Sequence, residues 1–348
     1  MKYQPLSREE MIRVIEGRGN ASRVPVLLHM WTGQEVFAQR ADEISAIKAL
    51  YPQDAQLIPL HIPQVYDAPS DDPSYRWSFK DSSLVEHAHD EADCIVDWEA
   101  DLPRLLEDFP SPDYPGLLRT RPAPDGRYRL GHWWFFFFER HWSLRGMTNA
   151  LMDYYSDPES VHALFRKLCD FYKAIIVRAH AELGLDGIFT SDDLGTQSSV
   201  FFSPEIFAEF FAPYYREVIE LLHSLGMHFW LHTCGNIERL IPQFIDMGVD
   251  VLHPIQKYTM DERHIAASYG DKLAIWAGFD VQQIIPWGTP EEVRREVRFM
   301  MDTYARADGR FLFTAGNMIN QDCPTESLRA IYDEAYQYGT KVVIRCAK

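Results

Sequence analysis

The feature that most constrains this chain is a repeated change from helix-like to strand-like sequence in its second half. A helix-like segment ends at glycine and a short apolar run follows, as in AELG before LDGIFT, HSLG before MHFWLH and ADG before RFLFTA. Glycine just past a helix stops it by adopting the left-handed conformation. The apolar runs lack polar alternation, which is typical of parallel strands covered on both faces. The pattern therefore predicts helices alternating with parallel strands.

Short polar residues followed by proline mark where several of these helices begin. They are Asp157 before Pro158, Ser203 before Pro204 and Thr289 before Pro290. A side-chain oxygen at this position accepts a hydrogen bond from a free amide of the first turn, where proline is well tolerated. Thr289 and Glu292 also fit a capping box, in which each side chain bonds the other residue's amide.

Counted along the whole chain, the pattern predicts eight strands. They cover residues 24–29, 56–61, 133–138, 186–190, 228–233, 249–253, 273–277 and 310–314. Eight strand–helix alternations favour closure into a (β/α)₈ barrel, so we expect one α/β domain over residues 1–348. Residues 65–128 break the rhythm and are rich in Asp, Pro, Ser and Trp, so we expect an insertion or elaborated loop there.

The composition excludes several classes of function. Lys and Arg total 34 against 51 Asp and Glu, which gives a formal charge of −17 and argues against nucleic-acid or anionic membrane partners. The chain has five scattered cysteines, no signal-like N-terminus and no apolar run of about 18 residues. We therefore expect a cytoplasmic protein with reduced cysteines, and a homodimer is compatible with the sequence.

Polar side chains of catalytic or ligand-binding type follow the predicted strands. Barrel enzymes place their active sites at the carboxyl ends of the strands, so these residues together predict a polar pocket. They are His29, Trp31, His61, Glu139, Arg140, Asp192, Asp193, His232, Cys234, His253, Gln256, Asn317 and Cys323.

His232 and Cys234 form the most specific pattern among them. Residues two apart on a strand point to the same side, so the imidazole and the sulfur can face one ligand. Both are zinc ligands, and a catalytic zinc takes three protein ligands and keeps one open position. Cys323 is a third candidate, because it precedes Pro324 at an expected helix N-terminus whose dipole would stabilise a thiolate. Ordinary buried packing is the competing interpretation of each cysteine.

Other candidates also carry structural alternatives. One of Asp192 and Asp193 is expected to face the pocket while the other caps the next turn. Residues 133–138 are interpreted as a buried strand whose ends could supply an aromatic wall. A solvated loop is favoured over a metal site for the cluster of His87, His89, Asp90, Glu91 and Asp93. Glycine-rich phosphate motifs and a G-x-S-x-G elbow are absent from the sequence.

Short motifs spread over nearly the whole chain, apart from residues 65–128, match one known family. They are RVPV at 23–26, LRGMTN at 144–149, MD at 152–153, SPE at 203–205, Phe207, PY at 213–214, HTCGN at 232–236, GVD at 248–250 and GFD at 278–280. With these motifs the chain resembles the uroporphyrinogen decarboxylase-like superfamily. The resemblance implies a distorted (β/α)₈ barrel with its active site at the strand carboxyl ends. It also implies either cofactor-free decarboxylation of uroporphyrinogen or zinc-dependent methyl transfer involving a corrinoid protein.

Two positions favour the methyltransferase branch of the family. The decarboxylases carry an Arg-rich motif after the first strand, whereas residues 29–34 read HMWTGQ and the next arginine is Arg40. A substrate with many carboxylates needs several fixed cations, and this loop provides none. The decarboxylases also have a histidine after the last strand, where this chain has Asn317.

The resemblance leaves the third zinc ligand open. The methyltransferase motif matches at His232 and Cys234, where a zinc-bound thiol or ether would be activated by the Lewis acid. Thiol-methylating members have a further cysteine, in a Gly-Cys-Gly setting, directly after the last strand. Register against Pro324 puts Asn317 there, and Cys323 follows six residues later. Either Cys323 replaces that ligand or the site is incomplete, which weakens the coenzyme M assignment more than methyl transfer itself.

We therefore predict a zinc-dependent methyltransferase that moves a methyl group between a methoxylated small molecule and the corrinoid (cobalamin) of a partner protein. The aromatic residues at 133–138 favour an aromatic methyl compound. His232, Cys234 and Cys323 are the predicted zinc ligands, and Glu139, Asp192 and His253 the predicted catalytic residues. The predicted substrate-binding residues are His29, Trp31, His61, Arg140, Asp193, Gln256 and Asn317.

Three alternatives remain at this point. The first is methyl transfer from a methylcorrinoid to a thiol such as coenzyme M. The second is a decarboxylase-like lyase acting on a smaller acid, with Arg140 or Arg145 and Asp192. The third is a non-catalytic, corrinoid-binding member of the family.

Overall fold

A curled, parallel sheet forms the centre of the protein. The structure, a computed structural model, describes residues 3–28, 34–63, 65, 68–77, 92, 94–317, 319 and 323–347. The sheet has seven strands in the order of the chain: β1 (Ala55–Pro59), β2 (Tyr128–Trp133), β3 (Gly187–Ser191), β4 (His228–His232), β5 (Val251–His253), β6 (Ala274–Phe279) and β7 (Phe311–Ala315). Every neighbouring pair is parallel, as the repeated helix–strand pattern predicts.

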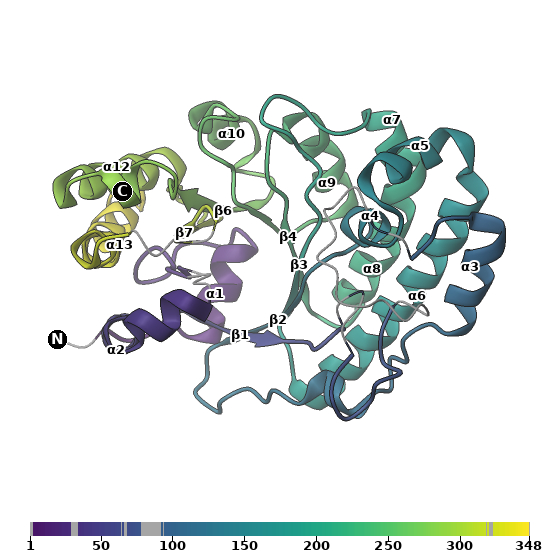
Figure 1. Cartoon of the computed structure of the whole chain (residues 1–348). Helices are drawn as coiled ribbons and strands as arrows, with labels where there is room; N and C mark the ends of the chain where they lie inside the picture. The colour runs from purple at the N-terminus through teal and green to yellow at the C-terminus, as the bar shows by residue number, and fades with distance from the viewer. Residues whose placement is uncertain are drawn as a thin grey trace.

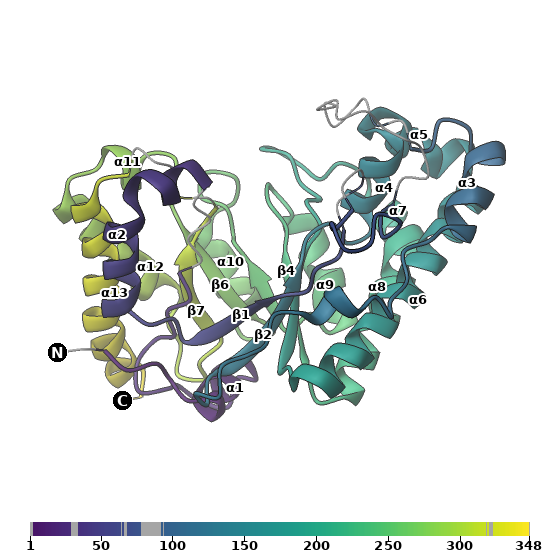
Figure 2. The same ribbon diagram turned by 60° about the horizontal axis from the view of Figure 1, so that its bottom comes forward.

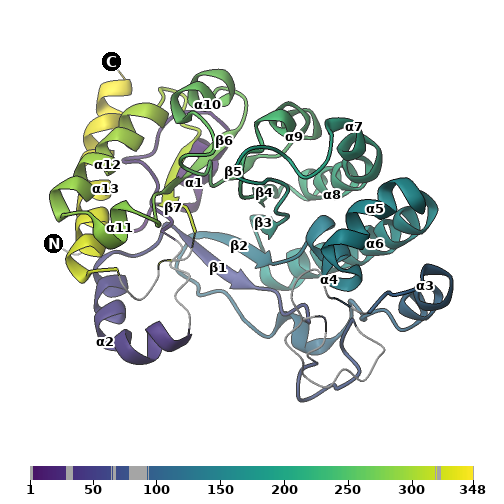
Figure 3. The same cartoon turned by 45° about the horizontal axis from the view of Figure 1, so that its top comes forward.

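Helices surround the curled sheet (Figures 1 and 3), and most of them lie on its outer face, whereas Met11, Val14 and Ile15 of the first helix pack into its interior cluster. They are α1 (Arg8–Ile15), α2 (Gln34–Leu50), α3 (Trp98–Glu107), α4 (Phe138–Arg145), α5 (Met147–Ser156), α6 (Pro158–Leu183), α7 (Pro204–Ile206), α8 (Ala212–Ser224), α9 (Ile241–Met247), α10 (Glu262–Tyr269), α11 (Ile284–Trp287), α12 (Pro290–Tyr304) and α13 (Thr325–Cys346). Short 3₁₀ or π turns cover Pro115–Leu118, Phe207–Phe211 and Glu238–Leu240. In the described part of the chain, no helix is both long and apolar enough to cross a lipid bilayer.

The predicted helix starts are confirmed. Asp157 accepts a hydrogen bond from the Ser160 amide at the start of α6, and Thr289 forms the expected capping box with Glu292 at the start of α12. The predicted glycine stop at the end of α6 is also present, because Gly184 has a φ of 58°.

The first predicted strand, at residues 24–29, is reduced to one bridge. Val26 pairs with Phe313 of β7, and the Leu27 amide donates to the Phe313 carbonyl at 3.0 Å. On its other side, the Val26 carbonyl accepts from the Asp54 amide, directly before β1, at 3.2 Å. This segment thus lies between β7 and the start of β1. This arrangement is consistent with a (β/α)₈ barrel. The sheet formed by the described residues nevertheless has seven strands and not the predicted eight.

The third predicted strand, at residues 133–138, is wrong in its position along the chain. β2 ends at Trp133, the chain then turns through Phe135 with a φ of 68°, and α4 begins at Phe138. The phenylalanine rings that follow pack between sheet and helices, with Phe136 5.0 Å from the Tyr172 ring. A short apolar run does not distinguish a strand from a buried turn. The inserted region at 65–128 also contains α3, which packs against α6 (Figure 2).

Alternation along the strands decides which side chains face the interior. Trp230 of β4 and Trp276 of β6 belong to the interior cluster, whereas Phe229 and Leu231 pack towards the helices. Since side chains alternate along a strand, His232 at the carboxyl end of β4 lies on the interior side.

Candidate metal and active site

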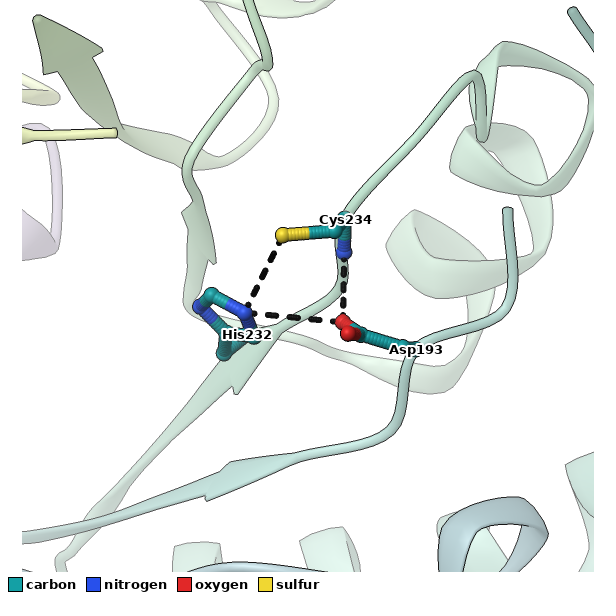
Figure 4. A group of neighbouring side chains, drawn as sticks. All are labelled: Asp193, His232 and Cys234. Atoms are coloured by element: carbon teal, nitrogen blue, oxygen red, sulfur yellow. Dashed lines mark hydrogen bonds and ion pairs between the residues drawn. The ribbon is translucent and has the colours of Figure 1, made fainter. Parts of the chain in front are cut away.

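Asp193, His232 and Cys234 converge at the carboxyl ends of β3 and β4 (Figure 4). One potential ligand atom from each residue lies within 4.8 Å of those of the other two. Cys234 Sγ is 3.3 Å from His232 Nε2, which is 3.5 Å from Asp193 Oδ1. We refer to these three residues as the His–Cys–Asp site.

The backbone that follows the two strands brings these side chains together. β3 and β4 pair in register, with Ser191 beside His232, so Asp193 and Cys234 each lie two residues beyond that pair. The Cys234 amide donates to Asp193 Oδ1 at 2.7 Å. Gly235 has a φ of 85°, and a Cβ there would lie 2.4 Å from the Gly195 backbone. Only glycine allows the two loops to approach so closely.

The chemistry of the donor set fits a zinc ion. Burial lowers the pKa of His232 against the opposing charge of Asp193, which keeps the imidazole neutral. Burial, followed by the charges of Asp193 and Glu139, raises the pKa of the Cys234 thiol. A cation would relieve this concentration of negative charge and bind the thiolate. Neutral imidazole, thiolate and carboxylate are the ligand types that zinc takes, and three of them leave a position open.

Asp192 and Asp193 have different partners, as predicted, but Asp192 caps α4, which precedes it in the chain, and not the next turn. Asp192 is fully buried and accepts hydrogen bonds from the first amides of α4, including Glu139 at 2.8 Å, and from the Tyr215 hydroxyl at 2.7 Å. Burial raises its pKa to about 6. Asp192, predicted to be catalytic, therefore caps a helix, whereas Asp193 faces the His–Cys–Asp site.

Glu139 lies in the first turn of α4, and its carboxyl group accepts a hydrogen bond from the Ser191 hydroxyl at the end of β3. Burial raises its pKa well above the usual value, and the charges of Asp193 and Asp192 raise it further. Glu139 consequently retains a proton at pH values where exposed carboxyl groups have lost theirs. The structure thus provides a buried acid whose ionised form is disfavoured by Asp193 and would in turn raise the pKa of Cys234.

The other predicted residues near the site contact its loops. Asn317 donates an amide hydrogen to Cys234 Sγ at 3.5 Å, and Gln256 accepts from the Gly235 amide at 2.8 Å. His253 Nδ1 is 2.7 Å from His232 Nδ1. These contacts support the His–Cys–Asp site from β5 and β7.

A small cavity of about 50 Å³ adjoins Cys234. Its lining comprises Cys234, Gln256, Lys257, Gly278, Phe279, Asp280, Val281, Gln282, Gly316 and Asn317. The Asp280 carboxylate accepts hydrogen bonds from backbone amides at the start of α11. Lys257 forms ion pairs with Glu262 and Glu296. A larger cavity of about 620 Å³ lies near Tyr3 and the end of α2, and its lining includes none of the predicted site residues that the structure describes.

The structure does not bring every predicted residue to the His–Cys–Asp site. Cys323 is buried, its carbonyl accepts from Arg40 at 2.7 Å, and it is not one of the three clustered residues. Arg140 is buried with its guanidinium 4.2 Å from the Trp77 ring. His61 Nε2 contacts the Thr120 hydroxyl at 2.8 Å. His29, Trp31 and the cluster of His87, His89, Asp90, Glu91 and Asp93 lie outside the described residues.

Two contributors to the site have no assigned role in the sequence-based prediction. Ser191 binds Glu139, and its position at a strand end is a signal that could have identified it. Tyr215 holds Asp192 from α8, and no local sequence pattern marks it.

Comparison with known proteins shows which family the chain matches. The family model for uroporphyrinogen decarboxylase matches residues 142–338, which is more than half of the 348-residue chain. A methylated-thiol–coenzyme M methyltransferase from Methanosarcina mazei is 26% identical over 187 residues, 54% of this chain and 47% of that protein. A uroporphyrinogen decarboxylase from Pseudoalteromonas atlantica is 22% identical over 214 residues, 57% of this chain and 54% of that protein. The chain thus spans about half the length of the curated relatives it matches.

Among solved structures, a methyltransferase from Methanosarcina mazei has the same fold. Its TM-score is 0.63 at 12% identity, and the match covers 96% of this chain and 99% of that one. The family match, the similar sequences and the shared fold lead to one conclusion. The chain belongs to the uroporphyrinogen decarboxylase family, whose relatives found here include a methyltransferase as well as decarboxylases.

Proposed function

We propose that this protein is a zinc-dependent methyltransferase that moves a methyl group between a methoxylated small molecule, aromatic in our preferred version, and the corrinoid of a partner protein. The observation that carries the proposal is the convergence of Asp193, His232 and Cys234 beside a cavity. These three residues would hold the metal. The proposal replaces Cys323 with Asp193 as third ligand, because only Asp193 belongs to this group.

The relatives support an enzyme and leave two chemistries, methyl transfer and decarboxylation. Decarboxylation of a polyacid needs cations that can reach the substrate. Lys257, the cation in the lining of the small cavity, is held by Glu262 and Glu296. Arg145 is bound to Asp153 at 2.9 Å. Both arrangements favour methyl transfer over a decarboxylase-like lyase.

Zinc, when bound here, would supply a Lewis acid for the oxygen or sulfur of the methyl compound. The protein's own residues prepare the rest of the site. Glu139 holds a proton that a departing oxygen could take, because burial and two neighbouring carboxylates keep its pKa raised. Asn317 directs an amide hydrogen at Cys234 Sγ. Phe279, which is buried, supplies apolar surface to the lining of the small cavity.

A thiol is the second candidate for the methyl-accepting group. The observation that favours it is the similarity to a methylated-thiol–coenzyme M methyltransferase. Assays with a methylated corrinoid and a free thiol, run beside assays with a methoxylated aromatic and a reduced corrinoid, distinguish the two directions.

The first test is metal content and zinc affinity. We expect the purified protein to bind zinc and Cys234→Ala to lose most of this affinity, because a ligand atom is removed. Cys346→Ala, on the last helix, is the matched control and should bind zinc as the parent does. A parent protein that binds no zinc, or a Cys234→Ala variant that binds it equally well, would refute the proposal.

A further inference from the structure

Two imidazoles connect the His–Cys–Asp site to the interior of the curled sheet. His232 Nε2 faces Cys234 Sγ at 3.3 Å, and His232 Nδ1 lies 2.7 Å from His253 Nδ1. His253 Nε2 then lies 3.2 Å from the carbonyl oxygen of Ala315, the last residue of β7. These contacts run from β4 through β5 to β7.

The last contact determines where one hydrogen lies. A carbonyl oxygen can only accept a hydrogen bond, so His253 Nε2 carries a hydrogen. His232 and His253 are each 3% exposed, and burial disfavours the charged form of an imidazole, so each ring carries a single hydrogen. A neutral His253 with hydrogen on Nε2 has an accepting Nδ1. The hydrogen between the two Nδ1 atoms therefore belongs to His232.

This assignment leaves His232 Nε2 without a hydrogen. Nε2 then presents a lone pair to Cys234 Sγ and, at 3.5 Å, to Asp193 Oδ1. The Asp193 oxygen is itself an acceptor, already bonded to the Cys234 amide. Two electron-rich atoms facing each other beside a sulfur form an arrangement that a cation stabilises.

We propose that His253 is a positioning residue: it keeps the hydrogen of His232 on Nδ1 and so holds the Nε2 lone pair ready for a metal ion. This inference rests on the proposed zinc site and adds to it the residue that orients one ligand. A partner that accepts from the second nitrogen of a metal-binding histidine fixes its tautomer and ring orientation. His253 would do this from the neighbouring strand, anchored by the Ala315 carbonyl.

The test compares two replacements of His253. His253→Leu removes the accepting nitrogen, whereas the side-chain oxygen of His253→Asn can accept from His232 Nδ1 in its place. We expect zinc affinity, measured by competition with a chromophoric chelator, to fall about 10- to 100-fold in His253→Leu and less in His253→Asn. His264→Leu is the control, because the His264 side chain is 54% exposed and pairs with Glu238 on the surface.

A spectroscopic measurement tests the inference without any metal. Nitrogen-15 NMR of the zinc-free protein should show His232 as the Nδ1–H tautomer. The Nε2–H tautomer would overturn the inference, even if His253→Leu failed to fold. Unchanged zinc affinity in both His253 variants would also overturn it, while leaving the proposed zinc site intact. A parent protein without zinc affinity, but with the Nδ1–H tautomer, would instead refute the proposed function and leave the hydrogen-bond arrangement standing.

Discussion

At the scale of single residues, neighbours in the sequence have unlike environments. Asp192 is turned into the protein, where amides of α4 surround it, and Asp193 is turned towards His232 and Cys234. The proposed metal ligands consequently come from two adjacent loops, and Cys323 is not part of the group that these loops bring together. The sequence contains all of these residues, but their distances depend on how the loops after β3 and β4 approach each other.

The choice between Asp193 and Cys323 as third ligand can be tested directly. We expect Asp193→Asn to weaken zinc binding about tenfold or more, because a charged oxygen is replaced by a neutral amide. Cys323→Ala should leave the affinity unchanged. Zinc titration of both variants distinguishes the two ligands. A loss of affinity in Cys323→Ala but not in Asp193→Asn would support the ligand set predicted from the sequence.

The raised pKa of Glu139 predicts that the turnover rate depends on pH. Its pKa is raised, so the proton is present at low pH and is lost as the pH rises through that value. Turnover that needs the proton should therefore fall on the alkaline side. Glu139→Gln should lower turnover about 10²- to 10⁴-fold and abolish this decline.

The measurement for Glu139 is a pH–rate profile of methyl transfer. Glu209→Gln, at an exposed glutamate, should keep the parent profile. A Glu139→Gln variant that retained both the rate and the alkaline decline would exclude Glu139 as the acid.

At the scale of elements, the start of α4 shows how a helix can be capped from elsewhere in the chain. Phe137 has no capping side-chain bond of its own, and the first amides of α4 are satisfied by Asp192 at the end of β3. The carboxylate is stabilised by these donors but destabilised by burial, which is the larger effect on its pKa.

This balance predicts a pH-dependent stability. The pKa of Asp192 is raised from 3.8 to about 6, so its contribution to folding is complete below about pH 4 and is lost as the pH rises through 6. The difference in free energy of unfolding between the parent and Asp192→Asn should therefore shrink by about 2 kcal/mol between pH 4 and pH 7. Urea denaturation at both pH values measures it. Asp170→Asn, whose parent side chain is 58% exposed, should show no such change, and a pH-independent difference for Asp192→Asn would contradict the prediction.

At the scale of the whole molecule, one buried carboxylate connects segments that lie far apart in the sequence. Asp54 accepts hydrogen bonds from the amides of Leu6 and Val26, at 2.8 and 2.6 Å, and forms an ion pair with Arg23 at 2.6 Å. These contacts hold the segment before residue 29 between β7 and β1. Asp54 therefore joins the two edges of the curled sheet.

We expect Asp54→Ala to lower the free energy of unfolding by about 3–5 kcal/mol, because it leaves Arg23 buried without its partner. Asp302→Ala, which removes an exposed ion pair with Arg345, should cost no more than about 1 kcal/mol. Chemical denaturation of the two variants compares them. Equal costs would show that Asp54 does not join the sheet edges as described.

Much of the fold was predictable because it depends on local chemistry. The caps at Asp157 and Thr289 and the glycine stop at Gly184 follow from hydrogen bonds and backbone conformation within a few residues, and the apolar runs mark where most of the strands lie. These are interactions between neighbours in the chain, so the sequence alone carries them. The family motif HTCGN likewise marked His232 and Cys234 as neighbours on one face.

Only the tertiary structure decided the features that depend on distant segments. The run after Trp133 is a turn because its rings pack against helices α6 and α8, although its composition suits a strand. Asp193 rather than Cys323 meets His232 because Gly195 and Gly235 let two loops touch. His253 binds His232 because β4 and β5 are paired in register. Local sequence sets the conformation that each segment prefers, whereas distances between side chains on different strands arise only when the sheet curls and its loops pack.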